Sequence, residues 1–259
     1  MPDTRPTVLS IAGFDPSAGA GVLADVKTFE DCGVYGMGVI SAITYQNDIA
    51  FEKVEWLTLL KIIEQIEVLQ KRFAFEYIKI GLIENLEILD QLVFFLKSTN
   101  TELKIIYDPI LKASAGFEFY KNQDQKLLED VCSKLYLITP NIPEAMELGT
   151  NKDAEKNAKY LSAFCNVYLK GGHSIEKKGI DLLFTTDGKE VLFPTTAENV
   201  SAKHGSGCVL SSAITANLAM GASLEEACWE GKKYITDFLA SNESLLGYHN
   251  KRIEHELKK

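Results

Sequence analysis

The pentapeptide His204-Gly205-Ser206-Gly207-Cys208 directly precedes an apolar segment, residues 209–220, whose pattern predicts a helix. The two glycines allow the backbone to approach a ligand with no Cβ in the way. The turn would present unpaired N–H groups at the positive end of the helix, which favours a bound anion. Cys208 lies where such a site would stabilise a thiolate. An anion site beside a base predicts phosphoryl or acyl transfer.

The same motif also has a purely structural interpretation. A Gly-x-Gly turn precedes many helices, and a cysteine is often only a small buried residue. On this motif alone, a structural role for Cys208 is the more frequent case. The choice between a catalytic and a structural Cys208 therefore depends on which other residues the fold places beside the motif.

Buried strands and amphipathic helices alternate along the chain. Short apolar runs predict strands at 8–11, 39–43, 77–80, 105–107, 135–138 and 167–169. Helical periodicity is found at 59–69, 86–96, 127–131, 206–220 and 224–241. This order predicts an α/β fold, a mostly parallel sheet with helices on both faces. Residues 180–184 and 191–193 flank a turn, so the sheet should finish with an antiparallel hairpin.

Glycines and polar residues follow the predicted parallel strands. Ligands bind beyond the carboxyl ends of the strands in such a sheet, so these segments should meet at one edge. Their convergence carries more weight than any single motif. The segments are 13–21, 46–48, 81, 108–109, 139–144 and 170–173.

Each of these segments, taken alone, also fits a structural role. Asn141 and Glu144 have capping-box spacing, which on these two residues alone is favoured over a magnesium site. Asp108, followed by a proline, fits the start of a turn, and Lys170 fits a solvated strand end. Asp25 and Gln46 fit solvent-facing positions. The 13–21 loop also lacks the glycine order of a P-loop or a dinucleotide site.

Composition limits the class of protein. A chain of 259 residues is expected to form one domain, 1–259. Its formal net charge of −9 argues against a nucleic-acid partner. The 5 cysteines have no Cys-x-x-Cys spacing and no signal peptide is recognised, which predicts a cytoplasmic location. No apolar run has the length of a membrane span, and the 4 histidines lack zinc-ligand spacing.

Taken together, the motifs closely resemble those of the hydroxymethylpyrimidine/phosphomethylpyrimidine kinases of thiamine biosynthesis, which belong to the ribokinase-like superfamily. The resemblance runs in order from about residue 8 to 240. The residues that carry it are Ala12-Gly13-x-Asp15-Pro16-Ser17-x-Gly19-Ala20-Gly21, Ala24-Asp25-x-Lys27-Thr28-Phe29, Gln46-Asn47, Lys79-Ile80-Gly81, Asp108-Pro109, Thr139-Pro140-Asn141-x-Pro143-Glu144-Ala145, Lys170-Gly171-Gly172-His173 and His204-Gly205-x-Gly207-Cys208.

The resemblance implies a three-layer α/β/α sandwich without a separate lid domain, a requirement for ATP and Mg²⁺, and a homodimer. It implies that Gly13, Asp25 and Gln46 hold the aminopyrimidine, whose amine donor and ring acceptor suit a carboxylate and an amide. Asn141 and Glu144 would organise Mg²⁺, partly through its waters.

The remaining roles concern the phosphates. The resemblance implies that Lys170 neutralises phosphate charge, and that Gly205, Ser206, Gly207 and Cys208 supply N–H groups to the anion. Asp108 would lie near the metal or the phosphates.

Many ribokinase relatives have Asp at the position of Cys208, so here the implied base is a thiolate. Cys208 would take the proton of the substrate hydroxymethyl group as its oxygen attacks the γ-phosphorus. General-base assistance contributes about 10²–10⁴-fold. In a second phosphorylation the nucleophile is the phosphate just installed, which is already anionic and needs no base.

The chain departs from the family pattern at several positions. Ala18 stands where Gly is frequent, Asp48 where Thr is frequent, Leu82 where Met is frequent and Ser206 where Thr is frequent. Asp48 adds a negative charge near the expected substrate loop. Residues 112–116 keep the usual Lys-Ser-Gly pattern only in part, and residues 245–259 lack a glycine-rich ending. These differences leave phosphoryl transfer intact and leave open whether both steps occur.

Three functions other than a pyrimidine kinase fit part of the same pattern. A pyridoxal or pyridoxine kinase shares the superfamily and also accepts a flat heteroaromatic alcohol. A non-catalytic pyrimidine-binding protein would be favoured by loss of Glu144, Lys170, Gly205 or Gly207, all of which are present. A cysteine hydrolase would need a histidine placed to pair with Cys208, and His204 most simply belongs to the turn.

Overall fold

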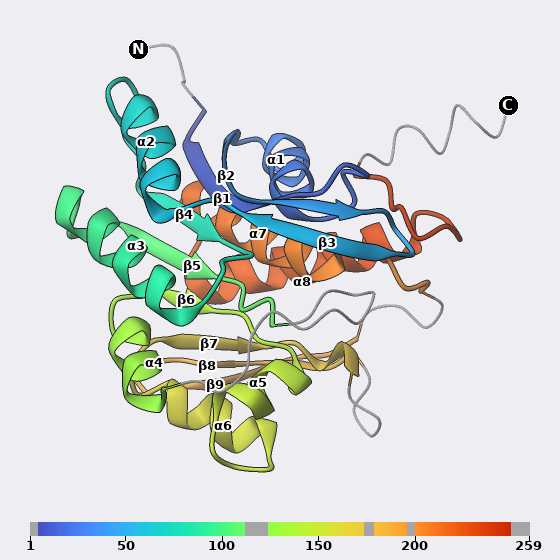
Figure 1. Cartoon of the computed structure of the whole chain (residues 1–259). Coiled ribbons are helices and arrows are strands. Elements are labelled where there is room, and N and C mark those ends of the chain that lie inside the picture. Colours follow the sequence, from blue (N-terminus) through green and yellow to red (C-terminus); the bar gives the residue numbers. More distant parts are fainter. Residues whose placement is uncertain (1–4, 112–123, 174–178, 196–199, 250–259) are drawn as a thin grey trace, which may run out of the picture.

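The alternating apolar runs form one nine-stranded sheet in the computed structural model, with strand order β3-β2-β1-β4-β5-β6-β7-β8-β9 (Figure 1). The structure describes residues 5–111, 124–173, 179–195 and 200–249. The strands are β1 (Thr7–Phe14), β2 (Tyr35–Gln46), β3 (Phe51–Trp56), β4 (Tyr77–Ile80), β5 (Lys104–Tyr107), β6 (Leu137–Ile138), β7 (Asn166–Leu169), β8 (Asp181–Phe184) and β9 (Glu190–Phe193).

The centre of the sheet is parallel and both of its edges are antiparallel. Six strands, β2, β1, β4, β5, β6 and β7 in sheet order, run parallel to one another. The β8–β9 hairpin closes one side, which confirms the predicted edge. The antiparallel strand β3 on the opposite side was not predicted. Its sequence, Phe-Glu-Lys-Val-Glu-Trp, is mostly exposed, so it lacks the apolar run that identified the other strands.

Helices cover both faces of the sheet, as predicted. α1, α7 and α8 pack on one face and α2 to α6 on the other (Figure 1). This is the three-layer sandwich that the resemblance implied. The helices are α1 (Gly21–Asp31), α2 (Leu59–Gln70), α3 (Leu86–Thr99), α4 (Gln125–Cys132), α5 (Ile142–Leu148), α6 (Ala154–Leu161), α7 (Ser206–Ala219) and α8 (Leu224–Ala240).

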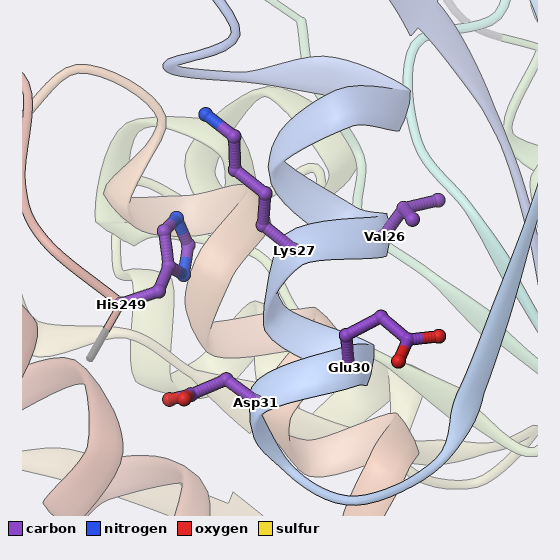
Figure 2. Close-up of a pocket in the computed structure, with 5 residues that line it drawn as sticks. All are labelled: Val26, Lys27, Glu30, Asp31 and His249. Carbon is purple, nitrogen blue, oxygen red and sulfur yellow. The ribbon is translucent and has the colours of Figure 1, made fainter.

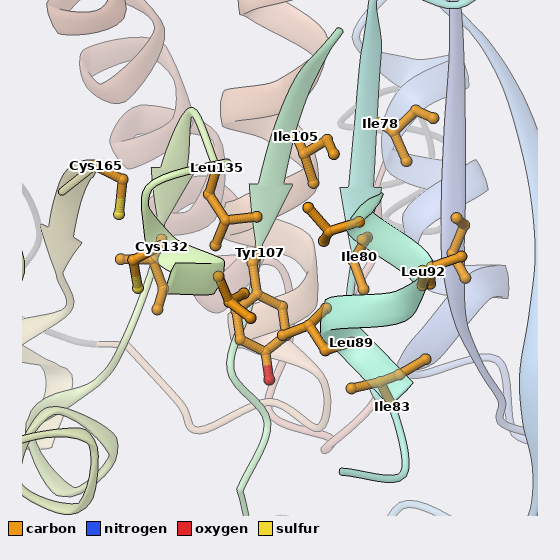
Figure 3. Packing of buried hydrophobic residues seen from close by; sticks show 14 of the residues in the cluster. Ile78, Ile80, Ile83, Leu89, Leu92, Ile105, Tyr107, Cys132, Leu135 and Cys165 are labelled. Carbon is orange, nitrogen blue, oxygen red and sulfur yellow. The ribbon is translucent and has the colours of Figure 1, made fainter. Parts of the chain in front are cut away.

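The larger hydrophobic core lies between the sheet and helices α2 to α6. Ile80 of β4, Ile105 of β5 and Leu89 of α3 are fully buried there (Figure 3). Each such side chain contributes roughly 1.5–3 kcal/mol by leaving water. Among the described residues every strand belongs to the one sheet, so no second sheet forms a lid. No helix in the described part of the chain has the length and apolar character that crossing a bilayer requires.

Backbone hydrogen bonds continue the sheet beyond the carboxyl ends of its central strands. The N–H of Asp108 donates to Ile80 O at 2.9 Å, and that of Thr139 donates to Tyr107 O at 3.0 Å. The N–H of Lys170 donates to the carbonyl of residue 140 at 2.8 Å. These bonds align the residues that follow β4, β5, β6 and β7, so their side chains meet at one edge.

Candidate active site

The glycine turn before α7 packs against the glycine loop between β1 and α1. Gly205 has φ +72°, a left-handed conformation that favours glycine. A Cβ at Gly205 would lie 2.0 Å from the carbonyl oxygen of Gly19. The two loops therefore touch through their backbones. The helix after the turn runs from Ser206 to Ala219, which confirms the predicted element.

Lys170 joins three other predicted site residues in one buried cluster. Its Nζ donates to Asp108 Oδ1 at 2.8 Å and lies 3.7 Å from Glu144 Oε2. A Cβ at Gly207 would lie 3.3 Å from the same Nζ. The ammonium group of Lys170 therefore lies against the glycine turn. This arrangement excludes the solvated strand end that Lys170 alone would have fitted, because the residue is 9% exposed.

Opposite charges control the ionisation of this cluster. Burial alone would lower the pKa of Lys170, but Asp108 and Glu144 outweigh it and the pKa is raised. Burial would raise the pKa of Asp108, but Lys170 and Lys79 outweigh it and the pKa is lowered. The Asp108–Lys170 pair is therefore charged. Thr139 Oγ1 also donates to Asp108, at 3.0 Å.

Glu144 is the member of the Lys170 cluster whose pKa lies nearest neutral pH. Burial raises its pKa to about 7, Lys170 lowers it and Asp108 raises it. Asn141 and Glu144 form the predicted capping box of α5: Glu144 N donates to Asn141 Oδ1 at 2.8 Å, and Asn141 N donates to Glu144 Oε2 at 2.7 Å. Glu144 Oε1 receives no hydrogen bond from the described residues. One carboxylate oxygen is thus available to a cation or its water.

Cys208 is buried in the first turn of α7, 6% exposed. Burial raises the pKa of its thiol to about 11, although Lys79 and the N–H of Gly21, which donates to Cys208 Sγ, both lower it. At neutral pH this side chain is therefore mostly a thiol, which differs from the thiolate expected from the helix end alone. The physical reason is desolvation, which exceeds the favourable contribution of the positive groups.

Asp25 does not face solvent. Both its oxygens accept from Lys79 Nζ at 2.8 Å, and both side chains are fully buried. Ser10 Oγ donates to Asp25 Oδ2 at 2.5 Å and Ser212 Oγ to Oδ1 at 2.8 Å. The carboxylate is thus satisfied inside the protein. Its predicted contact with a pyrimidine stays a prediction.

The other two predicted substrate residues lie at the ends of neighbouring strands. Gly13 is near the end of β1, where a Cβ would lie 2.9 Å from Leu82 Cδ2. Gln46 ends β2, is half-buried and makes no hydrogen bond through its side chain to the described residues. Thr44 Oγ1 donates to Phe14 O at 2.8 Å and ties the two strand ends together. No interaction joins Gly13, Asp25 and Gln46 directly.

Sequence reasoning missed several buried polar residues around the site. Lys79 is the third residue of β4, whose four residues are all buried. A lysine within so apolar a strand requires a buried partner, and that signal was available. Serines and threonines give no comparable signal, because their hydroxyl groups occur at buried and exposed positions alike. The missed hydroxyl residues are Ser10, Thr139, Ser211 and Ser212.

An open hollow of about 470 Å³ lies elsewhere, beside α1 and the segment that follows α8 (Figure 2). None of the predicted site residues lines it. Residues 112–116 and 250–259, noted above as departures, lie outside the described residues. The lining residues of the hollow are Val26, Lys27, Glu30, Asp31 and His249.

Comparison with known proteins finds relatives that match most of the chain. The Staphylococcus aureus (strain MSSA476) hydroxymethylpyrimidine/phosphomethylpyrimidine kinase is 34% identical over 238 residues, 88% of this chain and 86% of the relative. The crystal structure of phosphomethylpyrimidine kinase from Clostridium difficile 630 superposes with a TM-score of 0.75 at 34% identity and covers 90% of this chain and 99% of its own. The structure of the pyridoxal kinase from Staphylococcus aureus in complex with ADP superposes with a TM-score of 0.81 at 26% identity. It covers 95% of this chain and 94% of its own.

The family model described as phosphomethylpyrimidine kinase matches residues 15–253. That range includes the glycine turn, the Asp108–Lys170 pair, Glu144 and Cys208. The chain therefore belongs to the phosphomethylpyrimidine kinase family.

Proposed function

We propose that this chain transfers the γ-phosphoryl group of ATP to 4-amino-5-hydroxymethyl-2-methylpyrimidine, and then a second phosphoryl group to the monophosphate. The observation that carries the proposal is the buried Lys170 ammonium, which lies against the glycine turn and beside two carboxylates. Phosphoryl transfer depends chiefly on positioning and on neutralising the phosphate oxygens. The N–H groups of Gly205, Ser206, Gly207 and Cys208 and the Lys170 ammonium would do both.

The donor set near Lys170 fits Mg²⁺. Magnesium takes oxygen ligands and keeps several of its waters. One Glu144 oxygen accepts no hydrogen bond from the described residues, and Asn141 and Asp108 supply further oxygens nearby. Bound there with ATP, Mg²⁺ would neutralise charge on the phosphates. Glu144 would be held ionised by the cation, and Asn141 would hold Glu144 through the capping box.

The substrate would lie between the ends of β1 and β2. The Gln46 side-chain amide makes no hydrogen bond to the part of the chain that the structure describes, and it can pair with one donor and one acceptor on an aminopyrimidine. Gly13 would contribute through its backbone at the end of β1, since Leu82 already packs against its Cβ position. Both oxygens of Asp25 already accept hydrogen bonds from protein groups. Asp25 would therefore act on the substrate through the electrostatic field of its ion pair with Lys79 rather than through a direct hydrogen bond.

Cys208 would act as the base of the first step. Its thiolate form would accept the hydroxymethyl proton as the oxygen attacks phosphorus and would become the neutral thiol, and the raised pKa of about 11 means that only a small fraction of the protein carries this thiolate at neutral pH. Lys79 and the N–H of Gly21 would stabilise this thiolate before it takes the proton. The second step would need no base. We also propose a homodimer located in the cytoplasm, on the family resemblance alone.

A second substrate deserves a direct comparison, because the pyridoxal kinase structure gives the higher TM-score, 0.81 against 0.75. We favour the pyrimidine, since Gln46 and the Asp15-Pro16-Ser17 loop follow the pyrimidine kinases. A non-catalytic role is disfavoured by the intact Lys170 and Glu144 cluster.

The test is a competition in one reaction. Purified protein, Mg-ATP and equal concentrations of the hydroxymethylpyrimidine and pyridoxal are incubated, and the phosphorylated products are measured by mass spectrometry. The proposal predicts faster formation of the pyrimidine phosphate. Faster formation of pyridoxal phosphate would assign the chain to pyridoxal phosphorylation, and no product from either would favour a binding protein.

A further inference from the structure

Two residues outside the site described above join its two glycine loops. Asp15 lies in the loop between β1 and α1, and His204 immediately precedes the glycine turn before α7, 189 positions along the chain. His204 Nε2 and Asp15 Oδ2 are 2.9 Å apart. Asp15 is fully buried and His204 is 7% exposed. Among the described residues this is the one side-chain hydrogen bond between these two loops.

Asp15 also organises its own loop. The N–H and the Oγ of Ser17 donate to Asp15 Oδ1 at 2.9 and 2.8 Å, and the N–H of Ala20 donates to Oδ2 at 2.8 Å. Burial alone would raise the pKa of Asp15, but the bonds from His204, Ser17 and Ala20 outweigh it and the pKa is lowered. The carboxylate can only accept, so the hydrogen of the imidazole is on His204 Nε2.

His204 is held from the other side by the segment that follows α8. Its backbone N–H donates to Leu245 O at 2.9 Å. Lys203 Nζ donates to Ser244 O at 2.7 Å and to the carbonyl of Asn242. The imidazole therefore projects from a fixed backbone. Its second nitrogen, Nδ1, is buried and has no hydrogen-bond partner among the described residues.

The contact lies beside the reacting groups. A Cβ at Gly19 would lie 2.6 Å from His204 Cδ2, so the ring rests on the loop backbone. In the residues that follow, Gly205 touches Gly19 and the N–H of Gly21 donates to Cys208 Sγ. The loop that would position the substrate alcohol and the turn that would position the phosphate are thus held in register by one side-chain pair.

We propose that Asp15 and His204 are positioning residues that lock the β1–α1 loop onto the glycine turn, and that this lock sets the rate of phosphoryl transfer rather than the affinity for either substrate. The inference rests on the proposed function, since that function places the substrate at the end of β1, where this loop begins, and the phosphates at the glycine turn. Both loops would still bind their own ligand without the lock. What would be lost is their alignment, and a displacement of about 1 Å can cost on the order of 100-fold in rate.

Two substitutions of one residue separate the lock from a general effect on folding. In His204→Gln, the side-chain amide nitrogen can occupy the position of Nε2 and still donate to Asp15. In His204→Asn, the shorter amide matches Nδ1 and cannot reach Asp15. We expect kcat to fall on the order of 100-fold in His204→Asn with KM for both substrates unchanged, and His204→Gln to keep most of the wild-type kcat.

A second readout does not depend on activity. Opening of the lock would expose Cys208, which is only 6% exposed, so iodoacetamide should alkylate it faster in His204→Asn than in the wild type or His204→Gln. Peptide mass spectrometry measures this rate, with Cys32 as an internal reference. If His204→Asn does not fold, Asp15→Asn replaces it, because an amide has one acceptor oxygen where the carboxylate uses two. It should show the same two changes.

The outcomes are distinct. A His204→Asn protein with wild-type kcat and wild-type alkylation would overturn the lock. So would equal losses of kcat in the Asn and Gln variants accompanied by equal losses of melting temperature, because that pattern indicates a structural role only. A wild-type protein that phosphorylates no pyrimidine would instead refute the proposed function, and the alkylation rates would still decide whether the lock exists.

Discussion

At the scale of single residues, the site depends on buried charges that are each compensated by a partner. Lys79 with Asp25, and Lys170 with Asp108, form two buried ion pairs, both near enough to Cys208 to interact with its thiol. The sequence predicted that Lys170 and Asp108 lie in the site, because each follows a predicted parallel strand at the same edge of the sheet. It could not predict that burial would raise the pKa of Cys208 to about 11, because a helix end is visible in a sequence and the extent of desolvation is not.

Replacement of Lys79 tests the importance of this compensation. Lys79→Met leaves the Asp25 carboxylate buried without its counterion, so we expect a loss of about 3–5 kcal/mol in the free energy of unfolding, measured with urea. Lys53→Met is the matched control, because Lys53 pairs with Glu55 on the exposed surface. It should leave the unfolding curve unchanged. Equal effects of the two variants would contradict the account.

The role of Cys208 is tested by separating the two phosphorylations. Cys208→Ala should slow the first step by about 10²–10⁴-fold and leave the second nearly unchanged, because only the alcohol must lose a proton. Each step is assayed with its own purified substrate, the alcohol or the monophosphate. Equal losses in the two steps would show that Cys208 is not the base.

The pKa of about 11 also predicts a pH dependence. The thiolate fraction rises tenfold per pH unit below this pKa, so the rate of the first step should rise with pH between 7 and 10 in the wild type. The profile should flatten in Cys208→Ala, and the second step should lack this rise in both proteins. A first-step rate independent of pH in the wild type would contradict the assignment.

At the scale of elements, two glycine loops and the helices that follow them form the site. The sequence predicted both loops and α7, because glycine spacing and apolar periodicity are local signals. It could not show that Gly205 packs on Gly19, since that contact joins distant parts of the chain. The edge strand β3 was missed for a different reason. Half of its residues are charged and exposed to solvent, so it lacks a continuous apolar run.

Gly205→Ala tests the contact between the loops. An alanine there would combine a left-handed conformation with a Cβ 2.0 Å from Gly19 O. Gly221→Ala is the control, because Gly221 has φ +93° and no atom within 4 Å of its Cβ position. The control should lose roughly 1–2 kcal/mol of stability and keep its kcat, whereas Gly205→Ala should lose kcat as well. Equal kcat values would show that the contact has no role in the reaction.

Ala18 offers the opposite test, a gain of stability. It is the one non-glycine residue with positive φ, +56°, in the described part of the chain, and this conformation costs an alanine roughly 1–2 kcal/mol. Ala18→Gly relieves the strain but makes the unfolded chain more flexible, so we expect a net gain below about 1 kcal/mol in urea unfolding. Ala20→Gly, at φ −135°, should instead lose stability.

At the scale of the whole molecule, the sheet brings residues from both ends of the chain to one edge. Alternation of strands and helices was sufficient to predict the three layers and the edge of the sheet at which the predicted site residues gather. The polar network beneath that edge was not predictable, because which serines and lysines meet depends on strand order and register. The buried Lys170 and the glycine turn form one site only because β7 and α7 meet there.

The most direct test of a two-step pyrimidine kinase is a time course with Mg-ATP labelled in its γ-phosphate and the hydroxymethylpyrimidine as sole acceptor. Mass spectrometry follows the label in each product. The account predicts a labelled monophosphate that rises first and then falls as a doubly labelled diphosphate accumulates. A labelled monophosphate that accumulates without diphosphate would contradict the second step, and the absence of any labelled pyrimidine would contradict the account as a whole.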